Sequence, residues 1–252
     1  MSDPVVTVGG LSGSDCAALA ALLWGLSGRA GEAAGHTPLI APVLLMGRAE
    51  LAVAAHAMQP SPGLCALHES QRIERFAPLP MDAPLRLSAA QTDGGFALTI
   101  TAETGDAPLV RLLTRLRFTS PAQIAGLTGA TFGDRMAGQG ATWHKTRPLD
   151  AQSVARYLSL SHDRNPIHRD DQAARAAGLS GVVVPGMMIA GLAESLLDAP
   201  ATTLATRFMA PVPLGAALEM VAVPRRGGFR VFALLGDRTI AAITDLDTSA
   251  AP

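Results

Sequence analysis

Aromatic and charged residues are both scarce in this chain of 252 residues. Phe, Trp and Tyr together make up 4% of the sequence, and Asp, Glu, Lys and Arg make up 16%. We therefore expect a core of small aliphatic side chains, and the sequence offers no series of aromatic residues on which nucleic-acid bases could stack. With 20 basic and 21 acidic residues, the chain also lacks the basic excess that a nucleic-acid or anionic-membrane partner requires.

Cysteines and long hydrophobic runs are few as well. The two cysteines, Cys16 and Cys65, match neither a metal-binding nor a redox spacing, so we expect free thiols in a reducing compartment. The apolar run at residues 17–26 is too short to span a bilayer, and the N-terminal residues carry no basic segment typical of a secretory signal. We thus expect a cytoplasmic protein with neither a nucleic-acid nor a membrane partner.

What the sequence does contain is an internal repeat. APLPMDAPLRL at residues 77–87 and APVPLGAALEM at residues 210–220 share five identities at a constant offset of 133. Upstream, LLWGLSGR at residues 22–29 parallels RYLSLSHD at residues 156–163. Chance similarity in a chain rich in Ala and Pro is the alternative explanation. If the repeat is real, the chain consists of two similar halves.

The order of the expected elements predicts an α+β fold for each half. Alternating segments typical of strands occur at residues 85–93, 94–104, 109–119, 205–212, 216–225, 228–236 and 239–247. Each set of strands follows an apolar stretch with helical spacing, which in the first half runs from Val43 to about Met58. Gly-Gly pairs at residues 94–95 and 227–228 predict hairpin turns. We expect a first unit at 1–120, a linker at 121–145 and a second unit at 146–252.

The stretch SHDRNPIHRD, at residues 161–170, concentrates polar and charged side chains in ten positions. Asn165 precedes Pro166, which disfavours helical dihedral angles at Asn165 and indicates a turn. This turn can direct Asp163 and His168 into one pocket. A carboxylate and an imidazole that face the same pocket can hold and activate a water molecule. The amide of Asn165 can fix their orientation.

Two other interpretations of this loop stay open from the residues alone. The first is structural: Asp170 or Asp171 caps the short helix that follows, and the histidines are ordinary partly buried residues. The second is a metal site formed by His162, Asp163 and His168. Two adjacent ligands and a third beyond a proline rarely build a closed site, which disfavours the metal interpretation.

A second candidate feature is the segment GVVVPG at residues 181–186, which precedes an apolar run with helical spacing. Gly186 is expected at the N-terminus of that helix, where unpaired N–H groups and the helix dipole favour negative charge. A substrate carbonyl placed there, with Met187 beside it, would accept a hydrogen bond from Gly186 in an oxyanion-type arrangement. Taken alone, Pro185-Gly186 is more typical of a tight helix entry.

The motif S-x-D-x-N-P-I-H-x-D, shortly before GVVVPGM, resembles the hydratase motif of the MaoC-like family of R-specific 2-enoyl-CoA hydratases. The whole chain is similar to the fused form of that family, a double hot-dog in which two tandem units each wrap an antiparallel sheet around a central helix. By this resemblance Asp163 and His168 would be the catalytic pair and Asn165 their positioner. Gly186 would donate to the thioester carbonyl.

The resemblance departs from the family pattern at three positions. The family usually has Gly in place of His162 and His in place of Pro185. A serine often found eight residues into the following helix is replaced by Glu194, beside Ser195.

The first half lacks the polar motif. Arg29 stands opposite Asp163, Ala34 stands at the position of His168, and no Asn-Pro pair occurs there. We therefore expect one active site per chain, in the second half. The first half would serve as a scaffold whose apolar helix borders the acyl pocket.

The resemblance implies reversible hydration of a trans-2-enoyl-CoA to an (R)-3-hydroxyacyl-CoA, without a cofactor or metal. A medium, long or bulky acyl chain is expected, because a half free of catalysis can widen the tunnel. Acyl carrier protein is an alternative carrier to coenzyme A, and a homodimer of double-hot-dog chains is a further expectation. The alternatives to a hydratase are a hot-dog acyl-CoA thioesterase and a non-catalytic acyl-binding or scaffold subunit.

Overall fold

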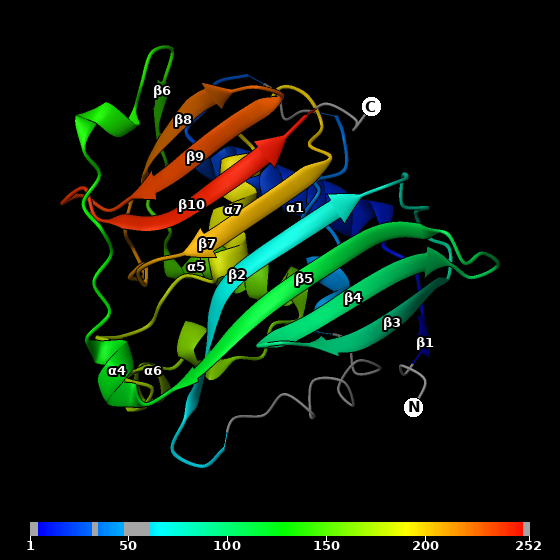
Figure 1. Cartoon of the computed structure of the whole chain (residues 1–252), viewed down its shortest axis with the longest axis horizontal. Coiled ribbons are helices and arrows are strands. Elements are labelled where there is room, and N and C mark those ends of the chain that lie inside the picture. Colours follow the sequence, from blue (N-terminus) through cyan, green and yellow to red (C-terminus); the bar gives the residue numbers. More distant parts are fainter. Residues whose placement is uncertain (1–4, 32–34, 48–60, 249–252) are drawn as a thin grey trace.

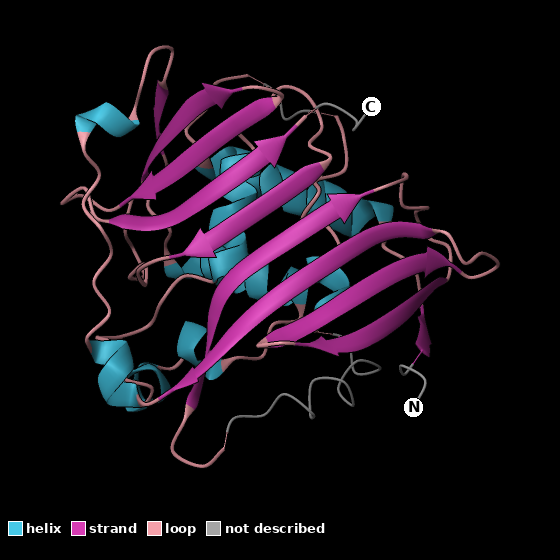
Figure 2. Cartoon of the chain, in the orientation of Figure 1, coloured by secondary structure: helices cyan, strands magenta, loops and turns pink. Residues whose placement is uncertain are grey.

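The computed structural model describes residues 5–31, 35–47 and 61–248, which form an antiparallel sheet of ten strands with helices on one of its faces (Figures 1 and 2). The first half contains β1 (Val5–Val8), α1 (Gly13–Leu26), α2 (Val43–Met46), β2 (Cys65–Arg75), β3 (Leu85–Thr92), β4 (Gly95–Ala102) and β5 (Pro108–Thr119). The second half contains α4 (Pro121–Ala125), η2 (Asp134–Met136), β6 (Thr142–Lys145), α5 (Ala151–Ser161), η3 (Pro166–His168), α6 (Asp171–Ala176), α7 (Gly186–Glu194), β7 (Thr203–Phe208), β8 (Glu219–Arg225), β9 (Gly228–Leu234) and β10 (Ile240–Asp247).

The two halves of the sheet repeat the same strand order. The order across the sheet is β1-β3-β4-β5-β2 and then β7-β10-β9-β8-β6, so each strand of the first half has a counterpart in the second. The halves meet at β2 and β7, where Ser70–Glu74 pairs with Thr203–Arg207. The predicted α+β double hot-dog is confirmed, and the repeat in the sequence is a repeat in the structure.

Local sequence signals explain the turns that shape the sheet. The predicted hairpins β3–β4 and β8–β9 are confirmed, and each uses a glycine with positive φ: 77° at Gly94 and 79° at Gly227. Non-glycine residues rarely adopt this conformation, so the Gly-Gly pairs are required for two tight turns.

Three strands were not predicted from the sequence. β1 and β6 are short edge strands, whereas β2 lies in the middle of the sheet between β5 and β7. The predicted linker contains α4 and β6, which pairs with β8; the unit boundaries themselves stay a prediction. The helix expected from Val43 to about Met58 is seen only as α2, which ends at Gly47, and residues 48–60 lie outside the described residues.

The core lies between the sheet and the helices α1, α5 and α7, which cover the same face of the sheet (Figure 1). Every residue of α7 from Met188 to Glu194 is buried, and Gly191 packs against Leu23 of α1 and against Ile40. Helix α7 is thus held by both halves, which fixes the place of its N-terminus.

Candidate active site

The polar loop begins where the chain turns at the end of α5. The helix ends at Ser161, and His162 follows in the left-handed region with φ 52° and ψ 24°. The N–H of Asp163 donates to Ser161 Oγ at 3.4 Å, and the guanidinium of Arg169 donates to the main-chain carbonyl of Asp163. Asp163 is therefore held close to the end of α5.

The Asn-Pro turn brings Asp163 and His168 together. The N–H of Asn165 donates to Asp163 Oδ1 at 2.9 Å, and Asn165 Oδ1 accepts from the N–H of Ile167 at 3.3 Å. Pro166 begins η3 with its fixed φ, and His168 ends it. Asn165 thus orients the carboxylate through its main chain and starts the turn that carries His168 through its side chain.

A hydrogen bond to the main chain determines which nitrogen of His168 faces the pocket. His168 Nδ1 lies 2.8 Å from the carbonyl oxygen of Val183. A carbonyl only accepts, so Nδ1 carries a proton, and in the neutral imidazole the lone pair is on Nε2. Nε2 lies 3.8 Å from Asp163 Oδ2, which is too far for a direct hydrogen bond. This separation allows a water molecule or a substrate hydroxyl to contact both groups.

The N-terminus of α7 lines the same cavity as this pair. Gly186 is its first residue, Pro185 gives no side-chain cap, and within the described residues neither Gly186 nor Met187 donates its N–H to another group. Two free donors and the helix dipole make this point favourable for a negatively charged oxygen. A Cβ at Gly186 would lie 2.9 Å from the Phe208 ring, so the close approach of this ring requires glycine.

All five predicted site residues line one cavity of about 1250 Å³: Asp163, Asn165, His168, Gly186 and Met187. The cavity lies where β2 and β7 separate, because Cys65–His68 pairs with β5 and not with β7. Its apolar lining includes Met46, Leu64, Ile124, Leu127, Leu179 and Met209. Both halves of the chain therefore build the pocket.

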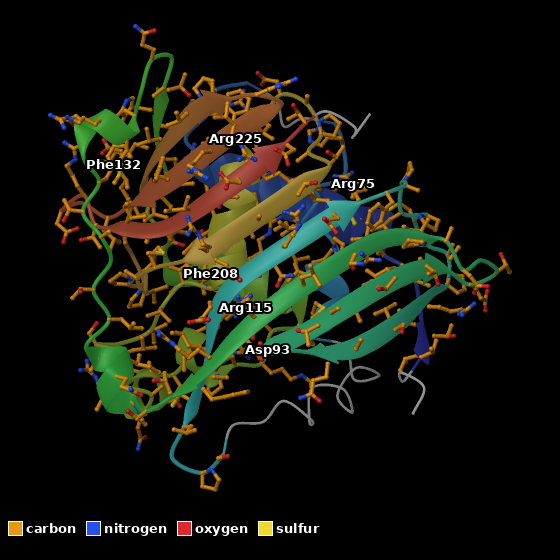
Figure 3. All side chains as sticks on the ribbon, in the orientation of Figure 1. Arg75, Asp93, Arg115, Phe132, Phe208 and Arg225 are labelled. Atoms are coloured by element: carbon orange, nitrogen blue, oxygen red, sulfur yellow. The ribbon has the colours of Figure 1, made fainter. Side chains whose placement is uncertain are left out.

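Arginines border the same cavity on the central strands. Arg115 of β5 and Arg207 of β7 both pair with Ser70 of β2, so the three side chains share one face of the sheet. Neither arginine forms an ion pair among the described residues, whereas Arg117 pairs with Glu69 at 3.2 Å. Figure 3 shows Arg115 near the centre of the sheet.

Sequence reasoning missed His68, which lines the cavity from β2. Its ring lies 4.8 Å from the Phe208 ring, between centroids, and Nε2 lies 3.1 Å from the carbonyl of Ser70 (Figure 3 labels Phe208). Burial lowers the pKa of His68 to about 4, against smaller raising effects from the Ser70 hydrogen bond and the Asp163 charge. No local signal marks this residue, because β2 itself was not predicted.

Tyr157 of α5 was also missed, although it is the single tyrosine of the sequence. Its side chain is fully buried and lines the cavity, and its hydroxyl has no hydrogen-bond partner in the part of the chain that the structure describes. Its position one helical turn before Ser161, the last residue of α5, is the signal that could have identified it.

The positions that depart from the family pattern have separate structural roles. His162 is exposed and occupies the left-handed position that ends α5. Glu194 is fully buried and accepts hydrogen bonds from the N–H groups of Leu39 and Ile40, so it binds the first half to α7. Burial raises the pKa of Glu194 to about 7, although these two donors and the Arg75 charge lower it.

The structural interpretation of the loop holds for one of its acids. Asp170 caps α6 by accepting from the N–H groups of Gln172 at 2.8 Å and Ala173 at 3.2 Å. Among the described residues, no group of three or more His, Cys, Asp or Glu side chains is arranged to hold a metal ion, the set of His162, Asp163 and His168 included. Asp163 and His168 face the cavity instead.

The first half uses the position opposite Asp163 for packing. Arg29 lies 4.5 Å from the Trp24 ring and donates to the carbonyl of Ser195 at 3.1 Å and to Asp198. It therefore ties the end of α1 to the residues after α7. Ala34, the counterpart of His168, lies outside the described residues. Within the ranges that the structure describes, no helix is both long and apolar enough to cross a membrane.

Comparisons with known proteins match one family and several individual proteins. Residues 134–231 match the family described as MaoC like domain. The enoyl-CoA hydratase ChsH3 of Mycobacterium tuberculosis is 32% identical over 154 residues, which are 55% of this chain and 53% of that protein. A mitochondrial 3-hydroxyacyl-acyl-carrier-protein dehydratase, FERN of Solanum lycopersicum, is 35% identical over 60 residues, 24% of this chain and 36% of the relative. The chain thus spans about half the length of the first of these relatives and less of the second.

The fold is shared along nearly the whole chain. The crystal structure of HtdX from Mycobacterium tuberculosis matches with a TM-score of 0.69 at 18% identity, covering 98% of this chain and 100% of HtdX. Residues 134–231, which hold the loop, α7 and most of the second half of the sheet, are thus similar to the MaoC-like family.

Proposed function

We propose that this chain is a hydro-lyase that adds water reversibly to a trans-2-enoyl thioester and forms an (R)-3-hydroxyacyl thioester. The observation that carries the proposal is the separation of 3.8 Å between His168 Nε2 and Asp163 Oδ2, in a cavity that is also lined by Gly186, whose N–H has no partner among the described residues. A base, a carboxylate and an oxyanion donor are the groups that this addition requires.

The proposed mechanism begins with the thioester carbonyl. Its oxygen accepts from the Gly186 N–H, which draws electron density from C3 of the enoyl group. Water bound between Asp163 and His168 loses a proton to Nε2 as its oxygen bonds to C3. The enolate charge lies on the carbonyl oxygen at the N-terminus of α7, where the helix dipole stabilises it. The pair then returns the proton at C2, which restores its starting state without a cofactor or metal.

The substrate we propose is a coenzyme A thioester with a medium, long or bulky acyl chain. A volume of about 1250 Å³ exceeds that of most small-molecule pockets and suits such a chain. Arg115 and Arg207 supply unpaired positive charge for phosphate groups. Acyl carrier protein is the alternative carrier, since a phosphopantetheine arm presents the same thioester. A cytoplasmic location, supported by the free thiols Cys16 and Cys65, and a homodimer of double-hot-dog chains are further proposals.

Asp163→Asn and His168→Gln test the proposal directly. Each should lower the rate of hydration of crotonyl-CoA and longer enoyl-CoAs by roughly 10²–10⁴-fold, the usual contribution of an acid–base group. The rate is followed by the loss of enoyl absorbance, with release of free thiol measured in parallel. Asp171→Asn is the matched control, because Asp171 lies on α6 and pairs with Arg175 outside the cavity.

Two results would contradict the proposal. Thiol release without hydration would identify a thioesterase. Near wild-type hydration in both folded variants would show that the pair does not carry the reaction.

A further inference from the structure

We propose that Tyr157 is a positioning residue of the active site, whose hydroxyl donates a hydrogen bond to the carboxylate of Asp163 through one water. The inference rests on the proposed function and extends it by a third side chain. It begins from an unsatisfied buried group: the Tyr157 hydroxyl has no hydrogen-bond partner among the described residues.

A buried hydroxyl without a partner calls for an explanation, because most buried polar side-chain atoms in proteins form hydrogen bonds. Val154, Leu158 and Ser161 form the buried face of α5 together with Tyr157. Phenylalanine would fill the same space without a polar atom, so packing alone does not account for the hydroxyl. The side chain lines the cavity, where a polar group can meet another polar group.

The carboxylate of Asp163 has one oxygen that can still accept a hydrogen bond. Its Oδ1 accepts from the N–H of Asn165 at 2.9 Å. Its Oδ2 has His168 Nε2 as its near neighbour at 3.8 Å, and that nitrogen keeps a lone pair because Nδ1 donates to the Val183 carbonyl. With His168 neutral, Oδ2 accepts no hydrogen bond from the described residues, and the Tyr157 hydroxyl donates none to them.

The local geometry places the two side chains on one side of α5. Tyr157 and Ser161 are four residues apart and share a helix face. The N–H of Asp163 donates to Ser161 Oγ, so the loop stays close to this face after the helix ends. Burial, and behind it the negative charge of Asp163, raises the pKa of Tyr157, so the phenol stays protonated as a donor at neutral pH.

Other charged groups near the carboxylate also influence the pKa of Asp163. Apart from Tyr157 itself, the titratable and charged side chains that line the cavity with Asp163 are Cys65, His68, Glu69, Arg115, Arg117, His162, Arg164, His168 and Arg207. Tyr157→Phe leaves all of them in place. A change in the pKa of Asp163 in this variant would therefore report the lost hydroxyl.

The first measurement needs no turnover. We expect the pKa of the Asp163 carboxyl group, followed by carbon NMR, to be higher by about 1 in Tyr157→Phe, because a hydrogen bond to the charged form is lost. Stability should fall slightly, because the same hydrogen bond is lost from the folded protein. An unchanged pKa of Asp163 in a folded variant would overturn the inference.

Kinetics then separate positioning from substrate contact. In Tyr157→Phe the kcat should fall about 10-fold with KM unchanged, and the acid limb of the pH–rate profile should move upward with the pKa of Asp163. Added to Asp163→Asn, the same change should have no further effect. Additive losses would contradict an action through Asp163. If the wild-type chain hydrates no enoyl thioester, the proposed function fails, and the NMR titration still decides the role of Tyr157.

Discussion

Glu194 and His68 are two buried titratable side chains whose effects on stability oppose each other. The pKa of Glu194 is about 7 in the folded protein against an ordinary 4.5, so the stability that its protonated form contributes is lost as pH rises between these values. The pKa of His68 is about 4 against 6.5, so its contribution is present above 6.5 and is lost as pH falls toward 4. The two pH ranges overlap, and within them the two groups change the free energy of unfolding in opposite directions.

Replacing either side chain should leave the pH dependence of stability that the other one causes. In Glu194→Gln the free energy of unfolding should rise from pH 4 to pH 6.5, because His68 still titrates. In His68→Gln it should fall from pH 4.5 to about 7, because Glu194 still titrates. In each variant the free energy of unfolding should change by at most about 3 kcal/mol over the stated pH range. Urea titrations at several pH values measure both, and parallel pH profiles for the two variants would contradict the assignment.

At the scale of elements, α5 and α1 end in the same way with different residues. His162 follows α5 with φ 52°, and Gly28, its counterpart in the repeat, follows α1 with φ 75°. A side chain in this conformation is strained, whereas glycine adopts it freely. The glycine that the family usually has at position 162 is thus explained by backbone conformation, and it requires no chemical role for His162.

Replacing His162 with Gly should therefore stabilise the protein by about 0.5–1 kcal/mol. The matched change Gly28→Ala should destabilise it by more than about 1 kcal/mol, because the new Cβ would also lie 2.0 Å from the carbonyl oxygen of Lys145. Urea midpoints compare the two variants. Loss of stability in His162→Gly would show that the imidazole makes a contact that offsets the strain.

At the scale of the whole molecule, the pocket depends on how the two halves join. The sheet is continuous from β5 through β2 and β7 to β10, yet β2 and β7 separate after five paired positions. The cavity lies at this separation, with the Asp163 loop from one half and β2 from the other. The first half lacks the polar motif, but it supplies part of the cavity wall, including an arginine.

This arrangement predicts a role for arginines of both halves in binding the carrier. The double change Arg115→Gln and Arg207→Gln should raise KM for an enoyl-CoA about 10-fold, because unpaired charge that binds phosphate is lost. KM for the matching N-acetylcysteamine thioester, which has no phosphate, should stay unchanged. Arg226→Gln, in the exposed β8–β9 turn, is the control for loss of an arginine outside the cavity. Equal increases for both thioesters would exclude phosphate binding.

The sequence by itself determined the features that depend on neighbouring residues. Asn165-Pro166 determined the turn, the glycine pairs determined two hairpins, and Asp170 determined a helix cap, because each acts through its own backbone or the next turn. The repeat at an offset of 133 determined the two-fold plan of the sheet. Asp163, His168 and Gly186 were predicted in the same way, since the motif and the helix entry lie within one segment, and all three line one cavity.

Only the tertiary structure decided what depends on distant pairing. β2 has the polar sequence CALHESQRIER, with little preference for a strand, and it is a strand because β5 and β7 pair with it on both sides. The bulge between His68 and Ser70 and its separation from β7 place His68 at the cavity. Partners more than a hundred residues apart leave no local pattern, so the pocket wall, the arginines and the burial of Tyr157 became visible only in the folded chain.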